Sequence, residues 1–168
     1  MTFLTFISHI IIEKHKHKSN LGENKKMISS PRHGWCTFSI GKDKDRCFTD
    51  RASYLTNVPV DLLDAFVTYT LNGYGCVVFD AEGYEYTLVL TAYNQSIYII
   101  DENNHLIDFS DLNADDLARE LIKDIESDLE NWISFATFDK DEEEENRSNI
   151  NRLLSLLKQE YFTYQGGA

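Results

Sequence analysis

The chain has 168 residues, of which 42% are apolar and 26% are charged, and this composition predicts one globular domain with its own core. The net charge of −12 counts against binding of nucleic acid or of an anionic membrane surface, because both present negative charge to a protein. Three cysteines without a CxxC spacing indicate a reducing cytoplasm and no disulfide framework.

Residues 1–26 differ in composition from the rest of the chain. They contain five lysines and two glutamates, a local charge of +3, so residues 27–168 together carry −15. The apolar run Phe3–Ile12 is shorter than the roughly 20 residues that a membrane span needs. The charged residues of this segment follow the apolar run, whereas a secretory signal peptide has its charged residues before the apolar run.

The chain is therefore expected to consist of an extension, one domain and a tail. Either Met1 or Met27 can be the native start. Few prolines and no Gly/Ser-rich tract argue against a second domain joined by a linker. The expected boundaries are 1–28 for a weakly ordered extension, 29–164 for a single α+β domain and 165–168 for the tail.

Two strands are predicted at the start of the domain. Trp35–Ile40 alternates between apolar and polar residues, which is the period of a strand. A turn follows at Gly41–Asp45, and Cys47–Leu55 is expected to form the second strand.

A helix is predicted next. Asn57 is a candidate N-cap just ahead of Pro59, and proline suits the first turn of a helix. Apolar residues at helical spacing then continue to Asn72 and Gly73, a common C-terminal stop.

The segment Tyr74–Phe109 predicts an antiparallel meander on which the other elements pack. Its four apolar or alternating runs are separated by three short polar turns, and such short connections permit only antiparallel neighbours. In the second run, one face is expected to carry Tyr84, Tyr86, Leu88 and Leu90. Tyr84, Tyr86 and Tyr98 are expected to include core residues whose hydroxyls reach the rim. An exposed tyrosine beside acids would indicate a protein interface.

Two further helices are predicted after the meander. Ser110–Asn113 offers N-cap oxygens, and helical spacing then continues from Leu117 to Ile133 as one helix of about five turns. The run 139–145 is expected to be a solvated acidic loop or the frayed start of a last helix over about 143–161. The outer face of the first helix is expected to carry Asp116, Glu120, Asp124, Asp128 and Glu130.

These elements predict an α+β fold, in which an antiparallel meander of about five or six strands packs against two or three α-helices.

The candidate metal motifs fail, and no metal or cofactor is predicted. A calcium-binding loop starting at Asp139 would have Glu144 where the turn needs glycine and Ile150 where the site needs a bidentate glutamate. The histidines of the extension, His15 and His17 with His9, form at most a weak metal site.

Two histidines are candidates for catalysis, whereas a catalytic carboxylate pair cannot be singled out among the 28 acidic residues. His33 with Cys36 could pair a base with a thiol, and His105 with Asp108 could pair a base with a carboxylate. The first pair is better interpreted as a surface histidine next to a buried cysteine. The second pair is better interpreted as polar residues of an edge strand, where such residues are expected. No P-loop, GxGxxG, HExxH or GxSxG is present, so we expect that the protein is not an enzyme.

Three stretches together resemble a known family. They are RASYLTNVPVDLLDAF at 51–66, VVFDAEGYEYTLVLT at 77–91 and SIYII at 96–100. The region 35–135 is similar to small acidic immunity proteins of bacterial polymorphic-toxin and contact-dependent inhibition systems. This resemblance implies a cytoplasmic protein that binds and neutralises one cognate toxin without catalysis, and it carries over no binding residue.

The charge and the resemblance suggest one function. A nuclease-type toxin should carry lysine and arginine at its substrate site, and an acidic surface can cover that site. The expected partner-binding residues are Asp116, Glu120, Asp124, Asp128, Glu142, Glu143, Glu144 and Glu145. Two alternatives remain, a regulatory or scaffold protein of a mobile element and an enzyme that uses His33 or His105. The oligomeric state is not predicted.

Overall fold

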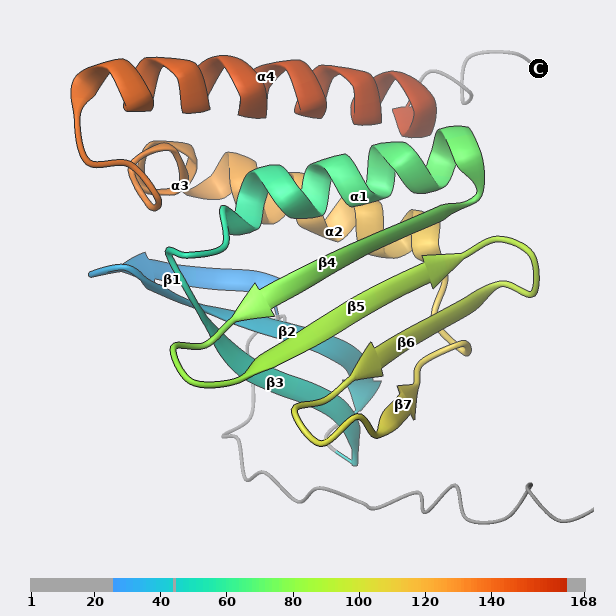
Figure 1. Cartoon of the computed structure of the whole chain (residues 1–168). Helices are drawn as coiled ribbons and strands as arrows, with labels where there is room; N and C mark the ends of the chain where they lie inside the picture. The colour runs from blue at the N-terminus through green and yellow to red at the C-terminus, as the bar shows by residue number, and fades with distance from the viewer. Residues whose placement is uncertain (1–25, 44, 163–168) are drawn as a thin grey trace, which may run out of the picture.

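The predicted meander is present as a four-stranded antiparallel sheet (Figure 1). The computed structural model describes residues 26–43 and 45–162. Alternation places Tyr86, Leu88 and Leu90 on the buried face, as predicted. The strands lie in chain order and are β4 (Tyr74–Asp80), β5 (Glu85–Thr91), β6 (Ser96–Ile100) and β7 (Leu106–Asp108).

The strands ahead of the first helix form a second antiparallel sheet. Its members are β1 (Ile28–Arg32), β2 (Trp35–Asp43) and β3 (Arg46–Ser53), in the order β1-β2-β3. The class is α+β, as predicted, but the strands form two sheets of three and four. The first helix connects β3 to β4 in the chain, and the described strands pair only within their own sheet.

Aromatic side chains join the two sheets. The ring centroids of Phe38 in β2 and Phe79 in β4 lie 4.6 Å apart, and Phe79 stacks on Tyr86 at 4.7 Å. Tyr84 has its hydroxyl at the rim, where it donates to Asp50 Oδ1 at 2.7 Å. The Tyr86 hydroxyl is buried without a hydrogen-bond partner among the described residues, so the expectation for its hydroxyl was wrong.

The domain begins earlier than the sequence suggested. Met27 and Ile28, assigned to the extension, are both buried in the core, and Ile28 pairs with Phe38. Pro31 and a register shift interrupt the alternation of β1, which is why its pattern is weak in the sequence. Residues 1–25 and the tail 165–168 lie outside the described residues, so the structure does not test what was expected of them.

The first helix, α1, spans Val58–Asn72 and ends as predicted. Gly73 adopts a left-handed conformation at φ 78°, and its N–H donates to Tyr69 O. Asn57 is at the N-cap position, as predicted, but its side chain accepts no hydrogen bond from the helix. Its Nδ2 instead donates to Asn146 Oδ1 of the last helix at 2.9 Å.

The predicted five-turn helix is two helices. The first, α2 (Ala114–Ser127), starts at Asn113, whose Oδ1 accepts the N–H groups of Asp115 and Asp116. The second, α3, spans Leu129–Ile133. Asp128 breaks the helix with φ −145° and ψ 37°, and Asn131 Nδ2 donates to its carboxylate at 2.6 Å. A local side-chain hydrogen bond of this kind competes with helix continuation.

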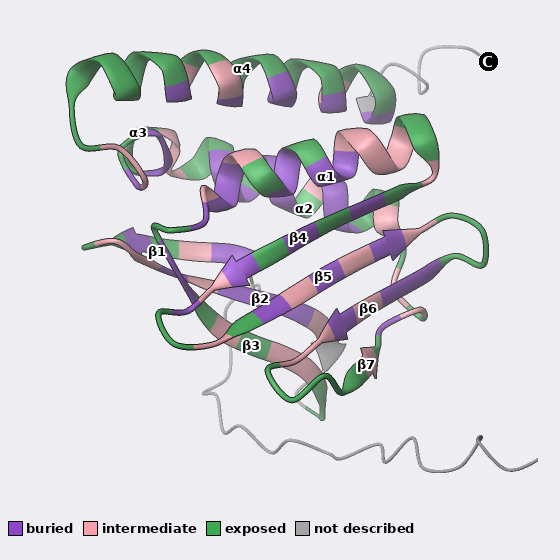
Figure 2. Ribbon diagram, in the orientation of Figure 1, coloured by how far each residue is buried: buried purple, intermediate pink, exposed green. Residues whose placement is uncertain are grey.

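The last helix, α4, spans Lys140–Phe162 and starts three residues before the predicted position. Its predicted apolar stripe is buried at Ile150, Leu153, Leu154, Leu157 and Tyr161. Figure 1 shows α4 on the side of α1 and α2 that faces away from the sheets. The buried residues of these helices line the interfaces between the layers (Figure 2). No helix within residues 26–162 combines the length and the apolar character needed to cross a membrane.

Candidate functional site

The start of α4 presents a cluster of carboxylates. Asp139 caps the helix, because its Oδ1 accepts the N–H groups of Asp141 at 3.0 Å and Glu142 at 2.9 Å. Acids in a first helical turn also complement the helix dipole. The run is therefore ordered helix rather than a loop. Its exposed acids, called the acidic patch below, are Asp139, Asp141, Glu142, Glu143, Glu144 and Glu145.

A buried hydrogen-bond network fixes the base of the acidic patch. Asn146 is buried, and its Nδ2 donates to Ile133 O of α3 at 2.7 Å while its Oδ1 accepts from Asn57. One turn of α4 is thus tied to both α1 and α3. Arg147 adds two hydrogen bonds of 2.7 Å to the Glu130 carboxylate. These bonds lower the pKa of Glu130.

The predicted acidic face of α2 is only partly exposed. Asp116 and Glu120 are on the surface, and Asp116 pairs with Arg119 at 3.1 Å. The pKa of Glu120 is raised, first by partial burial and then by repulsion from Asp124 and Asp116. The acids at this end of α2 therefore lie beside two basic residues, Arg119 and Lys123.

Asp124 is not a surface residue, and its assignment to the partner-binding set was wrong. It is 7% exposed, and its Oδ2 accepts the N–H of Met27 at 2.6 Å and of Ile28 at 3.2 Å. At 3.6 residues per turn, Asp124 lies one turn beyond Leu121, beside the buried stripe. Burial raises its pKa more than the two N–H donors and Lys26 lower it.

The predicted residues of α2 lie far from those at the start of α4. Asp128 is half-buried at the break between α2 and α3. The guanidinium of Arg119 lies 6.0 Å from the ring of Tyr161, so the start of α2 is beside the end of α4. Tyr161 follows Glu145 by 16 residues, about 24 Å along the helix at 1.5 Å per residue. The structure therefore divides the predicted surface into two separate acidic regions.

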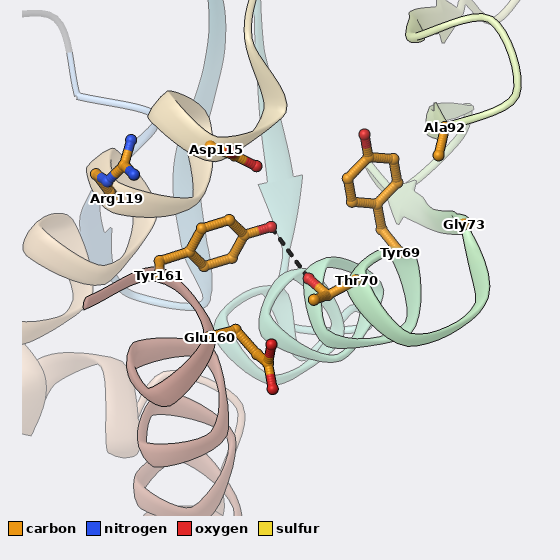
Figure 3. Close-up of a pocket in the computed structure, with 8 residues that line it drawn as sticks. All are labelled: Tyr69, Thr70, Gly73, Ala92, Asp115, Arg119, Glu160 and Tyr161. Carbon is orange, nitrogen blue, oxygen red and sulfur yellow. Dashed lines mark hydrogen bonds between the residues drawn. The ribbon is translucent and has the colours of Figure 1, made fainter. Parts of the chain in front are cut away.

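A cleft of about 440 Å³ lies where α1, α2 and α4 meet (Figure 3). Its lining brings together Tyr69 of α1, Asp115 of α2 and Tyr161 of α4, and Tyr161 Oη lies 3.0 Å from Thr70 Oγ1. Burial, and then the charge of Asp115, raises the pKa of Tyr69. Among the described residues, those that line the cleft include no Cys, His, Lys or Ser. No local pattern in the sequence marks this cleft, because its lining comes from three helices and from Gly73 and Ala92 in connecting segments.

The histidines considered for catalysis lie in other surroundings. His33 is exposed in the β1–β2 turn, while Cys36 is buried, and burial raises the pKa of its thiol to about 12. His105 Nδ1 lies 3.2 Å from Asp101 Oδ2 rather than beside the carboxylate of Asp108. Asp108 instead accepts the N–H of a following serine. Neither histidine lines the cleft.

Within residues 26–43 and 45–162, no group of three or more His, Cys, Asp or Glu residues is placed to hold a metal ion. The histidines His9, His15 and His17 lie outside this part of the chain. Comparison of the sequence with known protein families and curated proteins, and of the fold with solved structures, finds no match.

Proposed function

We propose that the chain is a bacterial immunity protein that binds and neutralises a cognate toxin in the cytoplasm, without catalysis of its own. The toxin would be basic and of nuclease type. The observation that supports this proposal best is the acidic patch, in which six exposed carboxylates project from a helix start that buried hydrogen bonds hold in place.

Charge complementarity is the physical reason for this partner. A protein that binds the phosphate backbone carries lysine and arginine in its groove, and fixed carboxylates can occupy that groove. Opposite potentials also steer the two proteins together and raise the rate of capture. Because Asn146 anchors the backbone at the base of the patch, that backbone is already ordered before binding, and only the exposed side chains lose rotamer freedom.

The geometry changes which residues we assign to binding. The acidic patch, which includes Glu142 to Glu145, forms the main contact. Asp116 and Glu120 form a second acidic region that only a large partner could reach at the same time. Asp124 is left out because it is buried, and Asp128 is left out because it is half-buried at the break between α2 and α3, outside the acidic patch.

The test compares two triple variants with equal changes in net charge. Glu143, Glu144 and Glu145 become glutamine in the first variant, which keeps the capping residues. The control changes the exposed meander residues Glu82, Glu85 and Glu102 to glutamine. The partner is captured from the native host by the full chain, purified, and titrated against each variant at low and high salt.

We expect the patch variant to bind about tenfold more weakly at low salt and to show a smaller salt dependence, as for charges at an electrostatically steered interface. The control should change affinity by less than about twofold. Equal losses of affinity in both variants would show that the partner responds only to the net charge of the chain and not to the acidic patch. Unchanged affinity of the patch variant at low salt would refute the proposed surface.

A further inference from the structure

Two exposed aromatic side chains lie beside the acidic patch. Phe138, immediately before it, is 79% exposed, and Tyr54 at the end of β3 is 36% exposed. Their rings meet edge to face at a centroid distance of 5.6 Å and an interplanar angle of 87°. Leu55, the next residue, is 58% exposed. We call Tyr54, Leu55 and Phe138 the apolar cluster.

Local contacts hold both rings in place. The N–H of Phe138 donates to the Glu142 carboxylate at 2.7 Å, so an acid of the patch also positions the aromatic residue. The N–H of Tyr54 donates to Gly34 O at 2.8 Å. The Tyr54 ring packs against Gly34 so closely that a Cβ there would lie 2.9 Å from Cδ1. These contacts order the backbone at both aromatic residues, and the contact between the two rings joins Tyr54 to the residue next to the patch.

We infer that the apolar cluster and the acidic patch form one docking surface, whose partner is a basic polypeptide with apolar side chains that cover the Phe138 ring. Interfaces place aromatic anchors at the centre and charged residues at the rim, and the anchors contribute most of the affinity. The acids would select a basic partner, and the buried ring would hold it. This inference rests on the proposed function and names the anchor of that interface.

The charge of the surface argues against other occupants. In a symmetric pair of copies the same patch would face itself, and six carboxylates on each side would repel. Nucleic acid would bring phosphates against the same carboxylates. A basic polypeptide is the occupant whose charge matches.

A matched control is available at the other end of the molecule. Tyr93 is 99% exposed and lies in the β5–β6 turn, whereas Phe138 lies in the loop between α3 and α4 (Figure 1). Since both side chains are exposed, neither Phe138→Ser nor Tyr93→Ser should disturb the fold, which circular dichroism can verify. The two variants therefore each remove a largely exposed aromatic ring, from different surfaces of the molecule.

The test uses two synthetic peptide probes with the full chain. One peptide alternates arginine with leucine, and the other alternates arginine with serine. We expect Phe138→Ser to weaken binding of the arginine–leucine peptide about tenfold, which corresponds to about 1.4 kcal/mol. The same variant should leave binding of the arginine–serine peptide unchanged, and Tyr93→Ser should affect neither peptide.

Three results would overturn the inference. They are no saturable binding of the arginine–leucine peptide to the unmodified chain, equal binding to Phe138→Ser, and an oligomer of the chain that Phe138→Ser dissociates. The glutamine variant of Glu143, Glu144 and Glu145 separates this inference from the proposed function. If only that variant weakens binding of the purified partner, the acidic surface stands and the apolar anchor fails.

Discussion

Asp124 should matter for stability, because it joins α2 to the first strand. Its Oδ2 atom accepts the N–H groups of both Met27 and Ile28, and all three residues are buried. Asp124→Ala would leave two buried donors without an acceptor. By contrast, Asp124→Asn would keep one oxygen, and a single oxygen accepts both hydrogen bonds in the structure.

The expected magnitudes follow from these contacts. Hydrogen bonds to a charged group contribute about 1.5–3 kcal/mol each, and each orphaned buried donor costs about 1–3 kcal/mol. Removing the charge also relieves the desolvation that raises the pKa of Asp124. We therefore expect Asp124→Ala to lose about 3 kcal/mol and Asp124→Asn to stay within about 1 kcal/mol of the unmodified chain.

Urea unfolding, followed by the fluorescence of the buried Trp132, would measure these differences. The pH dependence gives a further check. A carboxyl whose folded-state pKa is raised loses stability as the pH rises from 3.8 through that pKa. As the pH rises through this window, the stability of Asp124→Asn should therefore increase relative to that of the unmodified chain. Equal losses for the two variants, or a loss below about 0.5 kcal/mol for alanine, would refute this account.

Three other predictions concern separate parts of the fold. Gly75→Ala would place a Cβ 2.1 Å from a backbone oxygen of α1. Urea unfolding should therefore show a loss of stability of about 3 kcal/mol, and a loss below about 1 kcal/mol would contradict this contact. At pH 8, a thiol reagent should modify the exposed Cys76 quickly and the buried Cys36, whose pKa is about 12, only on unfolding; rapid labelling of Cys36 would argue against its burial. Burial alone would raise the pKa of Asp101, but hydrogen bonds from the backbone of His105 and Asn103 and from the His105 ring outweigh it. Carboxyl NMR should give a value below 3.8 that rises in His105→Ala, and the stability from this contact should disappear as the pH falls through that value.

Much of the fold was predictable, because periodicity is local. The alternation from Tyr84 onward assigned the buried face of β5 without knowledge of its neighbours. The stripe of α4 was equally clear. Two helix ends were also marked locally, by the Asn113 side chain, which accepts N–H groups of α2, and by Gly73, whose N–H donates to Tyr69 O. The break at Asp128 was missed, since an apolar pattern that continues across it gives no sign of the change in backbone angle.

The candidate binding surface was also predictable only where it depends on local sequence. The sequence by itself determined the acidic excess and the exposed run at the start of α4, because a charged segment without apolar spacing has no buried face. Only the tertiary structure decided that Asp124 is buried, and that Tyr54 meets Phe138 although 84 residues separate them. Contacts between distant segments depend on how layers pack, and the period of a single element contains no information about that packing.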